Sequence, residues 1–247
     1  MKNKKYFFLS GFMRCGNNLL TSIINQNPEV CITPNSIVPE MLYQMYKLQD
    51  TSLFKEQKDQ KSFDSSLKNI MTGYYSEWKQ NYIIERAPWG TPFNHQALKE
   101  LGLLPSKFVF LVRPVKEILA SFVKAVKPGD VVAFCKFLMD EGGPIGKSLI
   151  AYNNILKKEK RKNIMIINYH DLCSDPQQTV DKLYNFLNIP VFKKHKFTGL
   201  KQVDITSKQT KIRTNKIEVK KYDYDLWLPK EIIKGYENSI RHTRRKN

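Results

Sequence analysis

The residues best suited to chemistry stand in a short segment after an apolar run near the N-terminus. Gly11, Arg14 and Gly16 follow the run Tyr6–Leu9 and precede an apolar stripe with helical spacing. Glycine allows a close approach of the backbone, and both a helix N-terminus and a guanidinium bind phosphate oxygens. The segment therefore predicts a phosphate-binding loop, and an ordinary strand–turn–helix connection is the alternative.

Two asparagines follow this loop where a nucleotide kinase carries other residues. A kinase P-loop needs Lys and then Ser or Thr after its last glycine, and the hydroxyl binds magnesium. This chain has Asn17 and Asn18 instead. We expect one of them to cap the helix and to donate its amide to a ligand. The substitution disfavours a magnesium-dependent kinase, which stays as the alternative enzyme.

A second arginine follows the apolar run Phe108–Val112. Arg113 stands at the carboxyl end of this expected strand, and Ser121 lies eight positions further on, about two helical turns beyond Pro114. A guanidinium and a hydroxyl that converge on one point suit a phosphate monoester. The alternative is an arginine at a sheet edge and a small serine at a helix contact.

The cysteines give no sign of a metal site. Cys15, Cys31, Cys135 and Cys173 are far apart and form no pair at metal-ligand spacing. We therefore expect no metal.

The elements that must position these residues are short apolar runs that alternate with helical patterns. Runs of consecutive apolar residues are typical of buried parallel strands. The expected strands are Tyr6–Leu9, Tyr82–Ile84, Phe108–Val112 and Ile164–Ile167. The expected helices comprise residues 19–24, a segment between Pro114 and Lys127, a helix capped by Asp175 with Gln178 placed to close a capping box, and one that begins near Pro229. This order predicts an α/β domain whose parallel sheet is covered by helices on both faces and binds ligands at the carboxyl ends of its strands.

The remaining organisation is simple. We expect a single domain over residues 1–247, with 49–76 as an insertion or lid and 241–247 as a basic tail. Lys and Arg number 41 against 23 Asp and Glu, and the net charge of +18 favours anionic partners. Aromatic residues do not gather within a basic stretch, which argues against nucleic acid. The apolar run near the start is too short for a membrane span, so we expect a cytoplasmic protein.

Three segments together resemble the sulfotransferases that use 3′-phosphoadenosine 5′-phosphosulfate (PAPS), above all their tyrosylprotein and carbohydrate branches. The family's loop Pro-Arg/Lys-Ser-Gly-Thr-Thr-Leu is similar to residues 13–19, where Arg14, Gly16 and Leu19 match. Its Val-Arg-(Asp/Asn)-Pro…Ser pattern is similar to residues 112–121, and its Tyr-Glu-Asp-Leu segment to residues 169–172. The resemblance covers roughly residues 5–240 and implies a P-loop-like fold and sulfuryl transfer to a hydroxyl or amine.

The resemblance also implies a nucleotide site. It places the 5′-phosphosulfate on the first loop, the 3′-phosphate on Arg113 and Ser121, and the adenine near Tyr169. The residues that it assigns to PAPS, or to the product adenosine 3′,5′-bisphosphate (PAP), are Arg14, Cys15, Gly16, Asn17, Asn18, Leu19, Arg113, Ser121, Tyr169, Ser207 and Arg213.

Two cations suit the charge that develops during sulfuryl transfer. That charge lies on the leaving phosphate oxygen and the sulfonate oxygens, and fixed cations and N–H donors stabilise it without a metal. Arg14 suits the phosphate. Arg86, at the end of the second expected strand, resembles the family's Lys and suits the sulfonate.

The general base departs from both family patterns. Ala87-Pro88 stands in place of the His of the cytosolic branch, and Asn35 in place of the Glu of the tyrosylprotein branch. We favour Glu40 as the base, with Glu85 and His95 as alternatives. Because Asn17, Asn18 and Asn35 all depart from the pattern, a basic protein that binds nucleotide or nucleic acid without turnover is the non-enzymatic alternative.

Overall fold

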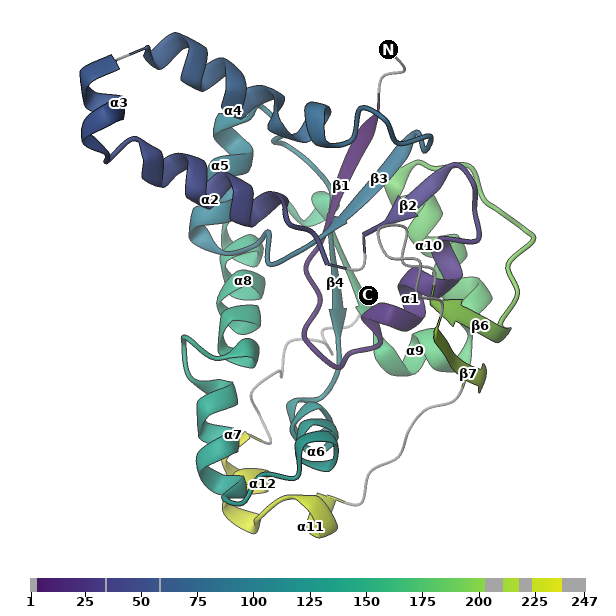
Figure 1. Cartoon of the computed structure of the whole chain (residues 1–247). Helices are drawn as coiled ribbons and strands as arrows, with labels where there is room; N and C mark the ends of the chain where they lie inside the picture. Colours follow the sequence, from purple (N-terminus) through teal and green to yellow (C-terminus); the bar gives the residue numbers. More distant parts are fainter. Residues whose placement is uncertain (1–3, 34, 58, 203–210, 218–223, 237–247) are drawn as a thin grey trace.

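A five-stranded parallel sheet lies at the centre of the chain (Figure 1). The computed structural model describes residues 4–33, 35–57, 59–202, 211–217 and 224–236. The spatial order of the strands is β2-β3-β1-β4-β5, and all neighbours are parallel. The strands are β1 (Lys5–Leu9), β2 (Val30–Ile32), β3 (Tyr82–Arg86), β4 (Phe108–Val112) and β5 (Ile164–Asn168).

Helices cover the sheet on both faces, as expected. Figure 1 shows α1 (Asn17–Ile24) and α10 (Pro176–Leu187) on one side of the strands, and α5 (Pro92–Glu100) and α8 (Pro144–Lys158) on the other. Every side chain of β4 is buried, which is typical of a strand covered on both faces. This arrangement confirms the predicted α/β fold.

The predicted strands and helices are all present in the structure, and one predicted capping contact is wrong. Asp175 caps α10 by accepting a hydrogen bond from the Gln178 backbone N–H. The Gln178 side chain accepts a bond from Lys182 instead of closing the capping box, which corrects that expectation. The sequence analysis also missed β2, a three-residue strand that is held by its pairing with β3.

Residues 49–76 are mostly helical. Together with α2 (Val38–Leu48), the helices α3 (Ser52–Gln57) and α4 (Gln60–Tyr74) project away from the sheet (Figure 1). The lid role predicted for this stretch stays a prediction.

The remaining elements lie between β4 and β5 in the chain or after β5. They are α6 (Val115–Val126), α7 (Val131–Met139), the 3₁₀ turn η1 (Arg161–Asn163), α9 (Tyr169–Ser174), β6 (Thr198–Gln202), β7 (Lys211–Lys216), α11 (Tyr224–Trp227) and α12 (Lys230–Tyr236). β6 and β7 form a separate antiparallel pair. Among the described residues, no helix combines the length and the apolar character needed to cross a membrane.

Candidate functional site

The parallel topology brings the predicted site residues to one edge of the sheet. Because all five strands run in the same direction, the loop after β1, Arg86 at the end of β3 and Arg113 after β4 share the carboxyl edge. Backbone bonds fix the loop there: Ser10 N–H donates to Val109 O at 2.9 Å, and Phe12 N–H donates to Leu111 O at 3.1 Å. The first loop therefore continues alongside β4 toward Arg113.

The loop itself adopts a backbone conformation that few residues tolerate. Arg14 has a φ of 62° and Gly16 a φ of 88°. A Cβ on Gly16 would lie 2.8 Å from the Tyr169 ring, closer than real contacts allow. A left-handed non-glycine residue costs roughly 1–2 kcal/mol, and away from helix ends such strained residues cluster at active sites and ligand-binding loops. Both features support the predicted phosphate-binding loop over an ordinary connection.

The N-terminus of α1 carries no side-chain cap. Gly16 is its N-cap residue, and no side-chain hydrogen bond is made to the first turn. Asn17 donates from Nδ2 to Phe12 O at 2.7 Å, while Asn18 Oδ1 accepts a bond from Arg86 Nη1 at 3.1 Å. The prediction that one of these asparagines caps the helix is therefore wrong, because both side chains have other partners. The uncapped helix end leaves its N–H groups directed at the loop, as an anion site requires.

The two predicted arginines lie next to each other. Arg14 Nε donates to Ser121 Oγ at 3.0 Å, and Arg113 Nη1 donates to Arg14 O at 3.3 Å, although the arginines are 99 positions apart. Arg113 and Ser121 are buried, whereas the Arg14 side chain is exposed at the loop. The guanidinium groups and the hydroxyl predicted from sequence thus converge on one place.

The surroundings of Arg113 include groups that the sequence analysis did not single out. Arg113 Nε donates to Glu117 Oε2 at 2.7 Å, and His170 Nε2 lies 3.0 Å from the same oxygen. The guanidinium carbon lies 4.1 Å from the centre of the Tyr169 ring. The spacing of Arg113 and Glu117, four positions apart at the start of a helix, was a signal that could have revealed the pair.

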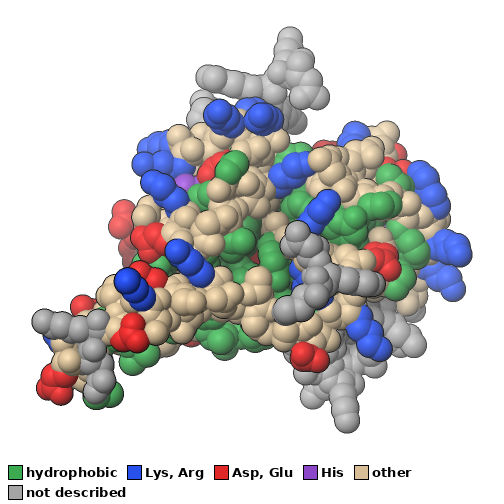
Figure 2. All heavy atoms as spheres, turned by 90° about the horizontal axis from the view of Figure 1, so that it is seen from above, with side chains coloured by type: hydrophobic (Ala, Val, Ile, Leu, Met, Phe, Trp, Pro, Cys, Tyr) green, Lys and Arg blue, Asp and Glu red, His purple; other side chains and the backbone are tan. Residues whose placement is uncertain are grey.

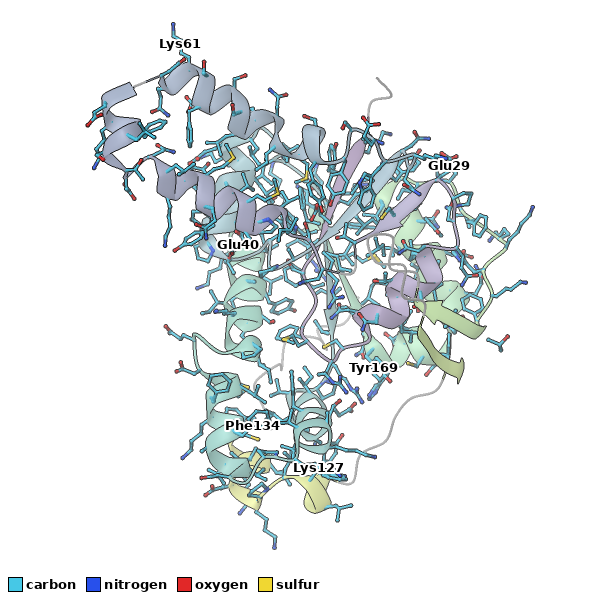
Figure 3. The ribbon with its side chains drawn as sticks, viewed as in Figure 1. Glu29, Glu40, Lys61, Lys127, Phe134 and Tyr169 are labelled. Atoms are coloured by element: carbon cyan, nitrogen blue, oxygen red, sulfur yellow. The ribbon has the colours of Figure 1, made fainter. Side chains whose placement is uncertain are left out.

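Tyr169 is buried between Arg113 and the loop at the start of α9 (Figure 3). Its ring lies on the guanidinium and close to Gly16, and the centre of the His170 ring is 5.8 Å away. Its predicted place beside the adenine stays a prediction. Ser207 lies outside the described residues, and Arg213 lies within β7.

Two further loop residues have side chains turned inward. The Cys15 thiol is fully buried, and burial raises its pKa well above the ordinary value, so the thiol is inert. Leu19 packs half-buried against the hydrophobic core. Any contact of these residues with a phosphate would come from the backbone. Within the described part of the chain, no three Asp, Glu, His or Cys side chains form a metal-binding group.

The three candidate bases differ in exposure. Glu40, in the first turn of α2, is exposed and accepts a bond from Gln44 Nε2 at 2.7 Å (Figure 3). Glu85 is fully buried beside Tyr75, and burial raises its pKa to about 7. His95 Nε2 lies 2.8 Å from Glu159 Oε1, and its side chain is only 14% exposed. Of the three, Glu40 alone is open to a substrate.

Comparison with known proteins gives a consistent result. Residues 7–193 match the model of the sulfotransferase family. The fold is similar to the mouse sulfotransferase SULT7A1 complexed with PAP, at 12% identity, with 100% of this chain and 86% of that chain covered and a TM-score of 0.57. Two sulfotransferase domains each give a TM-score of 0.51. The domain from the curacin biosynthetic pathway has 19% identity over 77% of this chain and 75% of its own. The domain from the Synechococcus PCC 7002 olefin synthase has 17% identity over 78% and 76%. Comparison with curated protein sequences gave no match.

Proposed function

Because the chain belongs to the sulfotransferase family, we propose that it transfers a sulfuryl group from PAPS to a hydroxyl or amine of an acceptor. The family membership supports a sulfotransferase, and the choice of donor rests on the arrangement of this chain's own cations. The similarity to SULT7A1, a structure complexed with PAP, supports the same donor.

One observation carries the proposal. Arg14, Arg113 and Ser121 come from two separate loop-and-helix units and meet in one hydrogen-bonded group. A donor with phosphates at both the 3′ and 5′ positions needs two anion sites within the reach of one nucleoside. The uncapped N-terminus of α1 supplies N–H donors on one side, and the buried Arg113 supplies a fixed guanidinium on the other.

The residues then divide between the two ends of the donor. We assign Arg113 and the Ser121 hydroxyl to the 3′-phosphate. The bound phosphate then replaces Arg14 Nε as the hydrogen-bond partner of Ser121. Arg14 turns toward the 5′-phosphate and joins the backbone N–H groups at the start of α1. Arg86 stabilises the sulfonate, and Asn18 Oδ1, which accepts one of its N–H bonds, orients the guanidinium.

Transfer itself needs a base. The acceptor oxygen or nitrogen attacks the sulfur, the bond from sulfur to the bridging phosphate oxygen breaks, and PAP leaves with that electron pair. We assign the acceptor's proton to Glu40, because its carboxylate is exposed and lies on the helix that follows β2. The bond from Gln44 leaves the second carboxylate oxygen available to accept this proton.

The surface charge supports an anionic acceptor. The net charge is +18, and Figure 2 shows Lys and Arg side chains dispersed over the visible face among hydrophobic and polar ones. Such a surface attracts anions from solution without a single binding stripe. This general charge favours an anionic acceptor, whereas selection of the nucleotide depends on Arg113 and Ser121 at the sheet edge.

Calorimetric titration tests the choice of donor. We expect PAP to bind at least tenfold more tightly than ATP with magnesium, because the chain has two phosphate sites and lacks the hydroxyl that holds magnesium in a kinase P-loop. Both titrations are run at about 150 mM salt, where exposed charges further apart than roughly 8 Å are screened. Tighter binding of ATP with magnesium would favour the kinase alternative and contradict the proposal.

A further inference from the structure

A buried carboxylate joins the proposed phosphate site to the C-terminal segment. Glu117 lies on α6 one turn after Arg113 and is only 6% exposed. Its Oε2 accepts the Arg113 Nε bond at 2.7 Å and lies 3.0 Å from His170 Nε2. A guanidinium can rotate about its side-chain torsions, and a charged acceptor at Nε fixes its plane.

The C-terminal segment contributes a third group to this carboxylate. Tyr224 is the first residue of α11. The centre of its ring lies 4.8 Å from Nζ of Lys116, the residue that precedes Glu117. Burial, followed by the charge and hydrogen bonding of Glu117, raises the pKa of Tyr224 to about 12. Further along, Lys124 Nζ lies 5.6 Å from the Trp227 ring, and Leu228 and Ile232 are buried. The segment is therefore docked along α6, with the Tyr224 ring on Lys116, the neighbour of Glu117 in the sequence.

We propose that Glu117 is a positioning residue for Arg113 and that Tyr224 holds Glu117 in place, so that docking of the segment 224–236 on α6 sets the affinity for the 3′-phosphate. This inference rests on the proposed function, since it assumes that Arg113 binds that phosphate. The groups that contact the guanidinium or its carboxylate come from α6 and α9, and α11 docks on α6. The three helices are distant in sequence.

The sign of the effect separates positioning from simple charge. A negative carboxylate beside an anion site repels the anion, so charge alone predicts that removing Glu117 strengthens binding of the 3′-phosphate. Positioning predicts the opposite, because the guanidinium loses the charged acceptor at Nε that sets its plane toward the phosphate. A purely structural role would lower the melting temperature and leave the preference for the 3′-phosphate unchanged.

Calorimetry measures this preference as the dissociation constant of adenosine 5′-phosphate divided by that of PAP. A lower ratio means a weaker preference for the 3′-phosphate. We expect Glu117→Ala to lower the ratio at least tenfold and Tyr224→Phe, which keeps the ring on Lys116, to lower it about threefold. Glu231→Gln removes an exposed carboxylate of α12 and serves as the matched control, with a ratio within twofold of the unmodified chain.

Two outcomes overturn the inference, and they differ in what else they overturn. If the unmodified chain prefers PAP but Tyr224→Phe and Glu117→Ala keep its ratio within twofold, or raise it, the positioning role fails and the proposed function stands. If the unmodified chain shows no preference for PAP, the assignment of Arg113 fails as well. Should Glu117→Ala not fold, Tyr224→Phe alone decides between these results.

Discussion

Replacing Arg113 with alanine is expected to weaken PAP binding by roughly 100-fold. A hydrogen bond to a charged group contributes about 1.5–3 kcal/mol, and each 1.4 kcal/mol is a factor of ten in affinity. Arg113 is buried and rigidly held, so most of that contribution is available to the ligand. The same change leaves Glu117 without its cation, and we expect a lower melting temperature in addition.

Two further variants make this result specific. Arg113→Lys keeps the charge but loses the planar fork, and we expect a loss of about tenfold with a milder effect on stability. Arg14→Ala removes an exposed side chain, so affinity should fall about tenfold while the melting temperature stays the same. PAP affinity that is unaffected by both Arg113→Ala and Arg14→Ala would remove the basis of the site. Salt-sensitive binding of oligonucleotides that persists in Arg113→Ala would favour the nucleic-acid alternative.

The second large effect concerns stability as a function of pH. Glu85 is fully buried on β3, and burial raises its pKa from 4.5 to about 7. Between these values the folded chain keeps a proton that the unfolded chain has lost, so stability falls as the pH rises from 4.5 through 7. A difference of 7 − 4.5 = 2.5 units corresponds to roughly 3 kcal/mol of unfolding free energy.

The variant Glu85→Gln keeps the size and the acceptor oxygen for Tyr75 but cannot ionise. We expect urea denaturation of the unmodified chain to show a loss of stability between pH 4 and pH 8 that is about 3 kcal/mol larger than in Glu85→Gln. Taking the difference between the two chains cancels the other titrating groups. Equal pH dependence in both chains would show that Glu85 ionises normally in the folded protein.

Much of the fold could be read from local patterns. β4 and β5 are consecutive apolar runs, and Asp175-Pro176 is a strong helix start, so sequence and structure agree there. The three-residue strand β2 is held by its neighbour β3 rather than by its own length, and no local pattern reveals that. α4 buries only Leu67, Ile70 and Met71, so its polar composition did not decide between a surface loop and an exposed helix.

The site was predictable to the extent that it depends on spacing. The interval from Arg113 to Ser121 predicted a hydroxyl facing the crevice, and the contact with Arg14 agrees with that geometry. The asparagines were misread as caps because their partners, Phe12 O and Arg86, are set by the tertiary fold. The approach of His170 to Glu117 and of Tyr224 to Lys116 could not be read from sequence, since each joins segments more than fifty residues apart.

The most direct test is a crystal structure of this chain with PAP bound. We expect the 3′-phosphate on Arg113 and Ser121 and the 5′-phosphate on Arg14 and the N-terminus of α1. The open 5′ end should point toward Arg86 and Glu40. A nucleotide bound in the opposite orientation, or away from the carboxyl edge of the sheet, would contradict this expectation.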